Sequence, residues 1–157
     1  MCVPARPGTR LGGPVRRGFL IDRGDIGYMA LREGETYTRE RTFTSEAVRQ
    51  FAAVTGDTQD RHTEPDEEGR LLVHGLLTAS LQTGIGGDLE VLASRMEFQF
   101  RRPVYTGDTV RCTWTNERVE DRPNGVELVA DVTCERVVDG TPEETVLDAT
   151  VEGVVLD

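Results

Sequence analysis

Residues 71–87, LLVHGLLTASLQTGIGG, are the segment from which the architecture can be inferred. Their only ionisable side chain is His74, whereas the rest of the chain is crowded with Asp, Glu and Arg. Apolar or small residues fall on every side of a 3.6-residue helix, which is typical of a helix buried all round. The segment is too short to span a bilayer, which needs about 20 apolar residues. We therefore predict a central core helix, ending near Gly84 or Gly87, around which the other elements wrap.

Length and charge limit the class of protein. The 157 residues suit one domain with a sizeable core. The formal net charge is −10, and all 18 basic residues are arginine. An acidic chain lacks the basic surface that nucleic acids and anionic membranes attract, so we expect neither as a partner. The acidic, lysine-free composition indicates a salt-adapted, halophilic protein, with an ordinary acidic cytosolic protein as the alternative.

The cysteine and histidine content argues against metal binding. Cys2, Cys112 and Cys134 do not have the spacing of metal ligands, and the chain has only two histidines. We also find no secretory signal pattern and no glycine-rich phosphate loop. We therefore expect free thiols, a cytoplasmic location, no metal and no cofactor.

Residues 1–28 differ in composition from the remainder. They hold five arginines, two acidic residues and three prolines, and they show no hydrophobic periodicity. We predict a disordered or non-native N-terminal extension without a catalytic role. The alternative is an arm that reaches a neighbouring subunit. Residues 29–157 are predicted to form the single domain.

A strand and a second helix are predicted before the central segment. Residues 35–43 are rich in Thr and aromatic residues and are predicted to form a strand. Thr44 or Ser45 then caps a helix that stops at Gly56, where glycine permits a left-handed end. Residues 57–70 form a loop with one possible short turn. The buried side of the helix is expected to hold Val48, Phe51, Ala52 and Val54.

The last seventy residues have the pattern of β-strands. Strands are predicted over 91–100, 109–119, 126–138 and 144–156, with hairpin turns at 122–125 and 139–140. Consecutive strands joined by short turns indicate an antiparallel meander. Because the apolar face of a sheet must be covered, we predict an α+β domain whose antiparallel sheet wraps around the central helix.

Asp57 and His62 lie five residues apart in the loop that leads to this helix. A carboxylate beside an imidazole can share general acid–base work. The N–H groups of Gly75 and Leu76, at the helix start, could stabilise an oxyanion such as a thioester enolate. Glycine at position 75 would also let a carbonyl approach the backbone closely. On spacing alone, a turn aspartate and a solvated loop histidine remain the alternative.

Three blocks of sequence resemble the MaoC-like, (R)-specific enoyl-CoA hydratase family, which has the hotdog fold. In chain order they are FAAVTGDTQDRH (51–62), VHGLLTAS (73–80) and FRRPVYTGD (100–108). The resemblance covers roughly residues 35–119, and the last two strands are compatible with it. Two features depart from the family pattern. Gln59-Asp60 stands where the family has Asn-Pro, and the loop from His62 to His74 is short.

The resemblance implies a role for several residues. Asp57 and His62 would be the catalytic pair that holds and activates water, and the Gly75 N–H would hold the thioester oxygen. A family serine or threonine that helps to position the pair corresponds to Thr83, with Ser80 nearby. His74 is implied to be a buried structural imidazole, and the alternative is a second base.

The same resemblance implies a carbon–oxygen lyase of fatty acid metabolism. The reaction would be reversible hydration of 2-enoyl-CoA to (R)-3-hydroxyacyl-CoA, on an acyl-CoA or acyl-carrier-protein substrate. A homodimer or higher homo-oligomer is implied, with the CoA phosphates near Arg101 or Arg102. Two alternatives remain. One is a hotdog acyl-CoA thioesterase in which Asp57 activates water, and the other is an inactive acyl-CoA-binding module, suggested by Gln59-Asp60.

Overall fold

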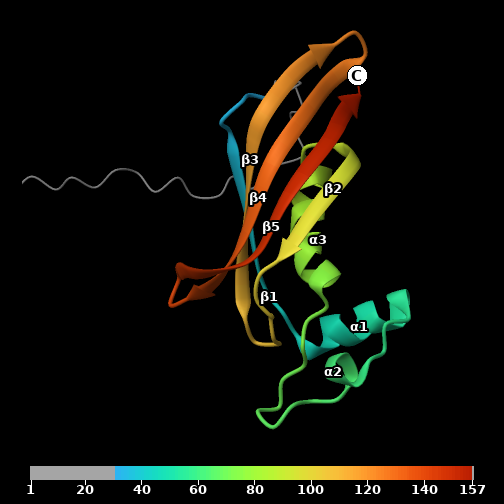
Figure 1. Ribbon diagram of the computed structural model, residues 1–157, viewed down its shortest axis with the longest axis vertical. Coiled ribbons are helices and arrows are strands. Elements are labelled where there is room, and N and C mark those ends of the chain that lie inside the picture. Colours follow the sequence, from blue (N-terminus) through green and yellow to red (C-terminus); the bar gives the residue numbers. More distant parts are fainter. Residues whose placement is uncertain (1–30, 157) are drawn as a thin grey trace, which may run out of the picture.

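The computed structural model describes residues 31–156 (Figure 1). The prediction for residues 1–28 therefore lies outside the described residues. In chain order the elements are β1 (Thr36–Thr42), α1 (Ser45–Thr55), α2 (Asp60–Thr63), α3 (Gly75–Asp88), β2 (Leu92–Phe100), β3 (Thr109–Arg122), β4 (Gly125–Val138) and β5 (Thr141–Leu156).

The strands form one antiparallel sheet in the order β1-β3-β4-β5-β2. The sheet is strongly twisted, and α3 lies against one of its faces (Figure 1). Helices α1 and α2 lie together beyond the N-terminal end of α3 (Figure 1). The prediction of an α+β domain with an antiparallel sheet around a central helix is confirmed.

The predicted meander holds for β3, β4 and β5 but is wrong for β2, which pairs with β5 at the edge opposite β1. The reason lies in residues 101–108, which are no hairpin turn. Within them, Val104 O accepts from Val73 N–H at 2.8 Å, and Thr106 N–H donates to Leu71 O at 2.9 Å. These bonds tie the connection to the segment before α3, so the chain crosses to the far edge before β3 begins.

The β4–β5 turn has the expected chemistry. Asp139 and Gly140 have φ of 50° and 79°, so both central residues are left-handed, as a type I′ hairpin requires. The strands are longer than predicted, since β3 continues to Arg122 and β5 already begins at Thr141.

Helix α1 begins and ends as predicted. The Thr44 hydroxyl accepts from Ala47 N–H at 3.2 Å, and Gly56 closes the helix with φ of 77°. Val48 and Ala52 are buried and Phe51 is half-buried, but the expected burial of Val54 is wrong, because that side chain is 86% exposed. Only a narrow side of α1 is buried, since the helix packs at the end of the domain and not across the sheet.

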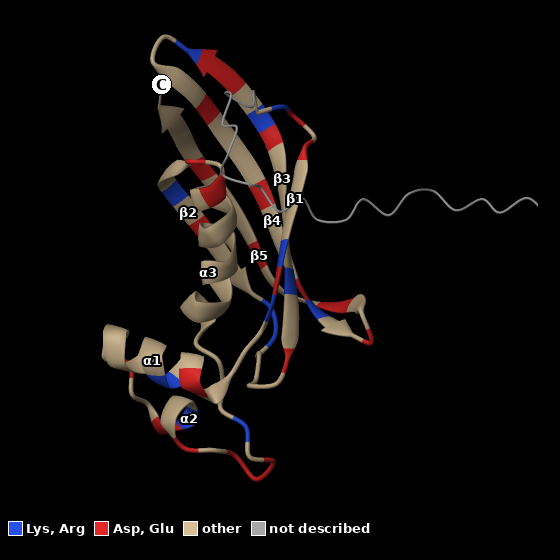
Figure 2. Cartoon of the chain, turned by 180° about the vertical axis from the view of Figure 1, so that it is seen from behind, with Lys and Arg blue, Asp and Glu red and all other residues tan. Residues whose placement is uncertain are grey.

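Helix α3 begins at Gly75, and residues 71–73 before it are not helical. Leu77, Leu81 and Ile85 are buried in the core. The expected burial on every side is wrong, since Leu76 is 58% exposed and Thr83 is exposed. The described residues provide one sheet for the helix and no second layer. Figure 2 shows α3 free of charged residues along most of its length, on the open side as well.

The core also holds a pair of thiols and the single tryptophan. Cys112 and Cys134 face each other across β3 and β4, and both are fully buried. A hydrogen bond to Cys134, together with burial, raises the pKa of the Cys112 thiol. Trp114 is buried and its indole N–H donates to Asn116 Oδ1 at 2.9 Å, so it is a packing residue, as predicted. Among residues 31–156, every helix is too short or too polar to cross a membrane.

Candidate active site

His62 is held by the backbone just before α3. It lies on the short helix α2, and its Nδ1 is 2.7 Å from Leu72 O. Because a carbonyl can only accept, Nδ1 carries the proton of the neutral ring, and Nε2 is left with its lone pair. The Leu72 N–H donates to Arg61 O at 2.9 Å, so α2 is bound to this segment on both sides of the imidazole.

Asp57 follows the left-handed Gly56 at the end of α1 and faces the free nitrogen of His62. The Asp57 Oδ2 and His62 Nε2 atoms are 3.8 Å apart, and the carboxylate side chain is 40% exposed while the imidazole is nearly buried. The Gln59 amide donates to Asp57 Oδ1 at 2.9 Å. This bond is the main reason that the pKa of Asp57 lies below its ordinary value; the Gln59 backbone and the two histidines add to it, against a smaller effect of burial.

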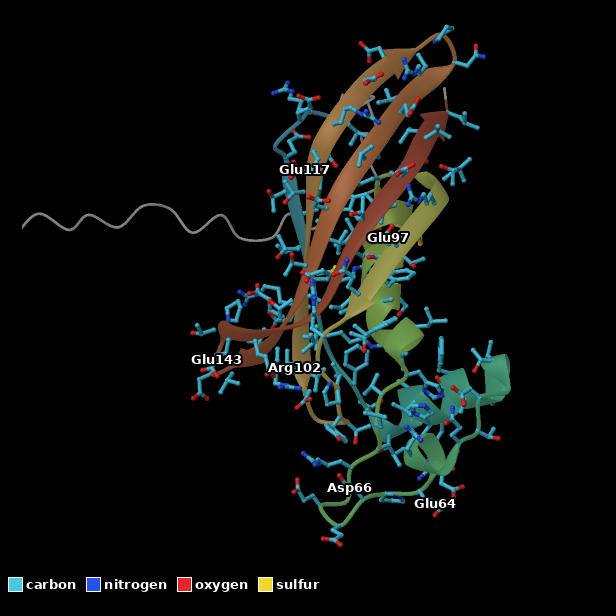
Figure 3. All side chains as sticks on the ribbon, viewed as in Figure 1. Glu64, Asp66, Glu97, Arg102, Glu117 and Glu143 are labelled. Carbon is cyan, nitrogen blue, oxygen red and sulfur yellow. The ribbon has the colours of Figure 1, made fainter. Side chains whose placement is uncertain are left out.

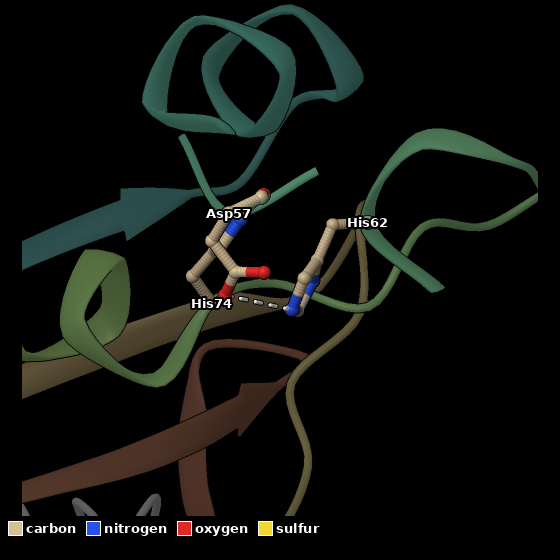
Figure 4. A group of neighbouring side chains, drawn as sticks. All are labelled: Asp57, His62 and His74. Carbon is tan, nitrogen blue, oxygen red and sulfur yellow. Dashed lines mark hydrogen bonds and ion pairs between the residues drawn. The ribbon is translucent and has the colours of Figure 1, made fainter. Parts of the chain in front are cut away.

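His74 lies next to both members of the pair (Figure 4). Its Nε2 is 3.0 Å from Asp57 O, and its ring stacks on that of His62 with centroids 3.7 Å apart. The ring of Phe51 lies 5.0 Å away on α1. His74 therefore positions both members of the pair, and its Nε2 is not free to act as a second base. Among the described residues, its buried Nδ1 has no hydrogen-bond partner.

The three side chains could also be considered as metal ligands. Asp57, His62 and His74 each offer one ligand atom, all within 4.8 Å of one another. The two imidazole rings are stacked with an angle of 18° between their planes. The ring-nitrogen lone pairs therefore lie in two nearly parallel planes. They do not converge on one ion, which would need both nitrogens at a zinc–nitrogen distance of about 2.1 Å. The arrangement suits acid–base chemistry better than metal binding.

The N-terminus of α3 lies beside this group. His74 occupies the N-cap position, and its side chain makes no capping hydrogen bond. The first N–H groups of a helix have no acceptor within the helix, so those of Gly75 and Leu76 are available to a bound oxygen. A Cβ at Gly75 would lie 2.8 Å from Phe100 Cε1, so a larger residue there would displace the Phe100 ring.

Ser80 and Thr83 are not brought to the Asp57–His62 pair. The Ser80 hydroxyl donates to Leu77 O at 2.6 Å, within its own helix. Thr83 is exposed on the open side of α3, about 12 Å along the axis from Gly75 at the rise of an α-helix. Their roles stay predictions.

Arg101 and Arg102, expected near the CoA phosphates, both pair with carboxylates. Arg101 Nε lies 2.9 Å from Asp148, and Arg102 Nε lies 3.2 Å from Glu144. Arg102 lies just past the end of β2, and Glu97 lies on that strand (Figure 3). Both arginines are exposed, and their expected role is a prediction.

Two contributors to the site could not be inferred from residue types. Leu72 acts through its backbone carbonyl, which accepts from His62. Gln59 acts through its side-chain amide, which binds Asp57, although its residue type indicates only a departure from the family motif. Asp60, the other residue of this departure, is exposed at the start of α2.

Known proteins resemble this chain in sequence and in fold. Residues 30–137 match the family model described as MaoC like domain. The chain belongs to the MaoC-like dehydratase family. It is 32% identical over 108 residues to 3-hydroxyacyl-thioester dehydratase Z of Mycobacterium tuberculosis, covering 60% of this chain and 72% of the relative.

Solved structures share the hotdog fold of this MaoC-like chain. The R-hydratase PhaJ1 of Pseudomonas aeruginosa superposes with a TM-score of 0.67 at 18% identity, over 81% of this chain and 83% of that one. The (R)-hydratase of A. caviae involved in PHA biosynthesis gives 0.65 at 23% identity, over 82% and 99%. The family and the names of its members support a lyase of the hydratase or dehydratase type.

Proposed function

We propose that the protein catalyses the reversible hydration of a 2-enoyl-CoA to the (R)-3-hydroxyacyl-CoA. The observation that carries this proposal is the position of the Asp57–His62 pair beside the uncapped N-terminus of α3. A water molecule between Asp57 Oδ2 and His62 Nε2 has an ionised carboxylate on one side and a lone pair on the other. The named relatives, a 3-hydroxyacyl-thioester dehydratase and (R)-hydratases, support the substrate class and the hand of the product.

In the proposed reaction, His62 Nε2 takes a proton from this water as the oxygen bonds to the β-carbon of the enoyl group. Charge then develops on the thioester oxygen, where the N–H of Gly75 stabilises it at the positive end of the helix. The imidazolium formed at His62 then gives this proton to the α-carbon, while the carboxylate of Asp57 stays ionised, and this completes the addition. Water is thus added across the double bond without any other reactant.

The protein is proposed to act as a homodimer. Strand β2 is an edge of the sheet among the described strands, and four large apolar side chains on β2 and α3 are exposed. Apolar side chains gathered beside a free strand edge are typical of an interface. A second copy pairing there would cover the open side of α3, which starts at the proposed oxyanion site. The four residues are Leu76, Leu92, Met96 and Phe100.

The direct test is an assay of crotonyl-CoA hydration, followed by loss of the enoyl absorbance and run at high salt. Asp57→Asn and His62→Ala are each expected to lower kcat/KM by about 10²–10⁴-fold, the usual contribution of a general acid or base. Asp60→Asn is the matched control, since this exposed carboxylate lies in the same loop and should be dispensable.

Full activity in either site variant would exclude the proposed mechanism. Release of free thiol together with an acid that keeps its double bond would indicate a thioesterase. Tight acyl-CoA binding without any turnover would indicate a binding module, in which the Gln59 amide holds the carboxylate that catalysis needs.

A further inference from the structure

A buried amide on α3 lacks the partners that buried polar groups normally have. The Gln82 side chain is 1% exposed, and its Oε1 has no hydrogen-bond partner among the described residues. Its Nε2 donates only to the thioether sulfur of Met96, at 3.7 Å. A thioether is a weak acceptor, and an amide buried without good partners destabilises a fold. Such a group is therefore a candidate for binding something else.

The side of α3 that carries Gln82 is otherwise lined by very small residues. Gly75, Ala79 and Gly86 lie on the same side of the helix, at the spacing of neighbouring turns. This side faces β2, where the Phe100 ring lies against Gly75 and Met96 lies on the amide. A Cβ added at Gly86 would make only ordinary van der Waals contacts. The nearest atom, 3.8 Å away, belongs to the indole of Trp114 on β3. We call this boundary the α3–β2 seam.

Within a single chain, the α3–β2 seam is open along its outer edge. Met96 and Phe100 belong to the helix-facing side of β2, because their partners on β5, Val151 and Leu147, are fully buried. Met96 and Phe100 themselves are 40% and 54% exposed, since β2 is an edge strand and α3 does not cover it completely. A methionine side chain is unbranched and adapts readily. An approaching ligand therefore meets Met96 as the adaptable side chain in contact with the amide.

We propose that Gln82 binds a hydroxyl group carried by the acyl chain, which makes hydroxylated acyl thioesters the preferred substrate class. This inference rests on the proposed function, because the thioester at Gly75 is what directs the acyl chain into the α3–β2 seam. A hydroxyl both donates and accepts, so it satisfies Oε1 and Nε2 of Gln82 together. An unsubstituted chain leaves both atoms unpaired, and a ketone leaves Oε1 unpaired.

The helix geometry fixes how far along the chain the hydroxyl lies. Gly75 and Gln82 are seven residues apart, which is about 10 Å along the axis, and the side chain points back over the preceding turn. The amide is then roughly 6–10 Å from the thioester. An extended chain of single bonds advances roughly 1.3 Å per carbon, so the hydroxyl belongs at about the sixth to ninth carbon.

The test compares the affinities of the full-length protein for two saturated thioesters, 8-hydroxydecanoyl-CoA and decanoyl-CoA, by calorimetry. Saturated ligands are not hydrated, so the result does not depend on turnover. We expect the hydroxylated ligand to bind at least about tenfold more tightly, because the plain chain leaves a buried amide unpaired. Gln82→Leu should abolish or reverse this preference. Leu81→Met, a volume-conserving change at a buried site on the same helix, should keep it.

Crotonyl-CoA hydration in the same preparations tests the proposed function separately, since a four-carbon chain is too short to reach Gln82. A preparation without hydration but with the tenfold preference contradicts the proposed function and supports the role of Gln82. Equal affinities in the wild type, failure of both ligands to bind, or a preference that survives Gln82→Leu would overturn the assignment.

Discussion

The two histidines of the site are oriented by backbone carbonyls and not by other side chains. Leu72 O accepts from His62 Nδ1, and Asp57 O is the partner of His74 Nε2. The carbonyl partners lie 10 and 17 residues away along the chain. No pattern of residue types reports on such bonds, so the tautomers of this site could be read only from the structure.

The first prediction at the residue scale concerns Gln59. Its amide is the main cause of the lowered pKa of Asp57. In Gln59→Leu, the pKa of Asp57 should therefore rise toward its ordinary value of 3.8. A lowered pKa in the folded state means that stability linked to the ionised carboxylate is present above the unfolded pKa and is lost as pH falls through the folded one. As the pH falls, the variant should therefore lose this stability at a higher pH than the wild type does. Titration of the Asp57 carboxyl by NMR measures the shift.

The control for this prediction is Gln50→Leu, which removes an exposed glutamine amide that binds Glu46 on α1. That change should leave the Asp57 titration as it is. An unaltered Asp57 pKa in Gln59→Leu would show that the amide does not hold the carboxylate in solution.

The candidate pair itself could be predicted, because Asp57 and His62 stand at fixed spacing in a block that resembles a known family. The surroundings of the pair could not. The stacking of His74 on His62 brings together residues from a loop helix and from the N-cap of α3. Their contact depends on how the intervening eleven residues fold back, which no local rule describes.

At the scale of elements, the sequence pattern of α3 predicts that a core helix exists, but not which of its sides are buried. The lack of charge between Leu76 and Gly87 indicates a helix in the core, and the helix is there. It does not indicate which sides are covered, because an uncharged helix surface suits burial within one chain or against another copy. The start of α3 was also placed too early, since Leu71 and Val73 are buried without being helical.

A pair of glycine variants tests the description of the helices. Gly87 lies in α3 with no atom within 4 Å of an added Cβ, and its φ is not positive. Gly87→Ala should therefore stabilise the protein by about 0.5–1 kcal/mol, since alanine favours the helix. Gly56 has equally open surroundings but a φ of 77°. Gly56→Ala should destabilise by about 1–2 kcal/mol, the cost of a left-handed residue with a Cβ.

Urea denaturation of the two variants beside the wild type gives both values. A loss of stability in Gly87→Ala would mean that this side of α3 is tightly packed in solution.

At the scale of the whole molecule, the open side of α3 predicts self-association. Leu76→Glu should turn a dimer into a monomer, because it places a charge among the exposed apolar side chains of α3 and β2. The helix itself should tolerate the change, since a negative charge in the first turn favours the dipole. Val54→Glu is the control, because Val54 is the more exposed apolar residue, at 86%, and lies on α1 rather than on α3 or β2. Sedimentation at several protein concentrations distinguishes the two outcomes.

An unchanged mass for Leu76→Glu would place the interface elsewhere. A wild type that is monomeric at all concentrations would remove the basis of the dimer.

The topology of the molecule was predictable only where strands are joined by tight turns. Asp139-Gly140 specifies the β4–β5 hairpin through two left-handed residues, and sequence rules describe such turns. The position of β2 depends on the connection 101–108 and its bonds to the segment before α3. Pairing between distant segments has no comparable local signature, so the order β1-β3-β4-β5-β2 emerged from the structure alone.

The facing thiols of Cys112 and Cys134 have a practical consequence for following how this molecule opens. They lie in the middle of the sheet, under α3, and a thiol with a raised pKa reacts slowly even when a reagent reaches it. Alkylation at these two positions should thus occur only when β3 and β4 separate from the core. Its rate, read by peptide mass analysis, would record the lifetime of the closed domain under working conditions without any engineered residue.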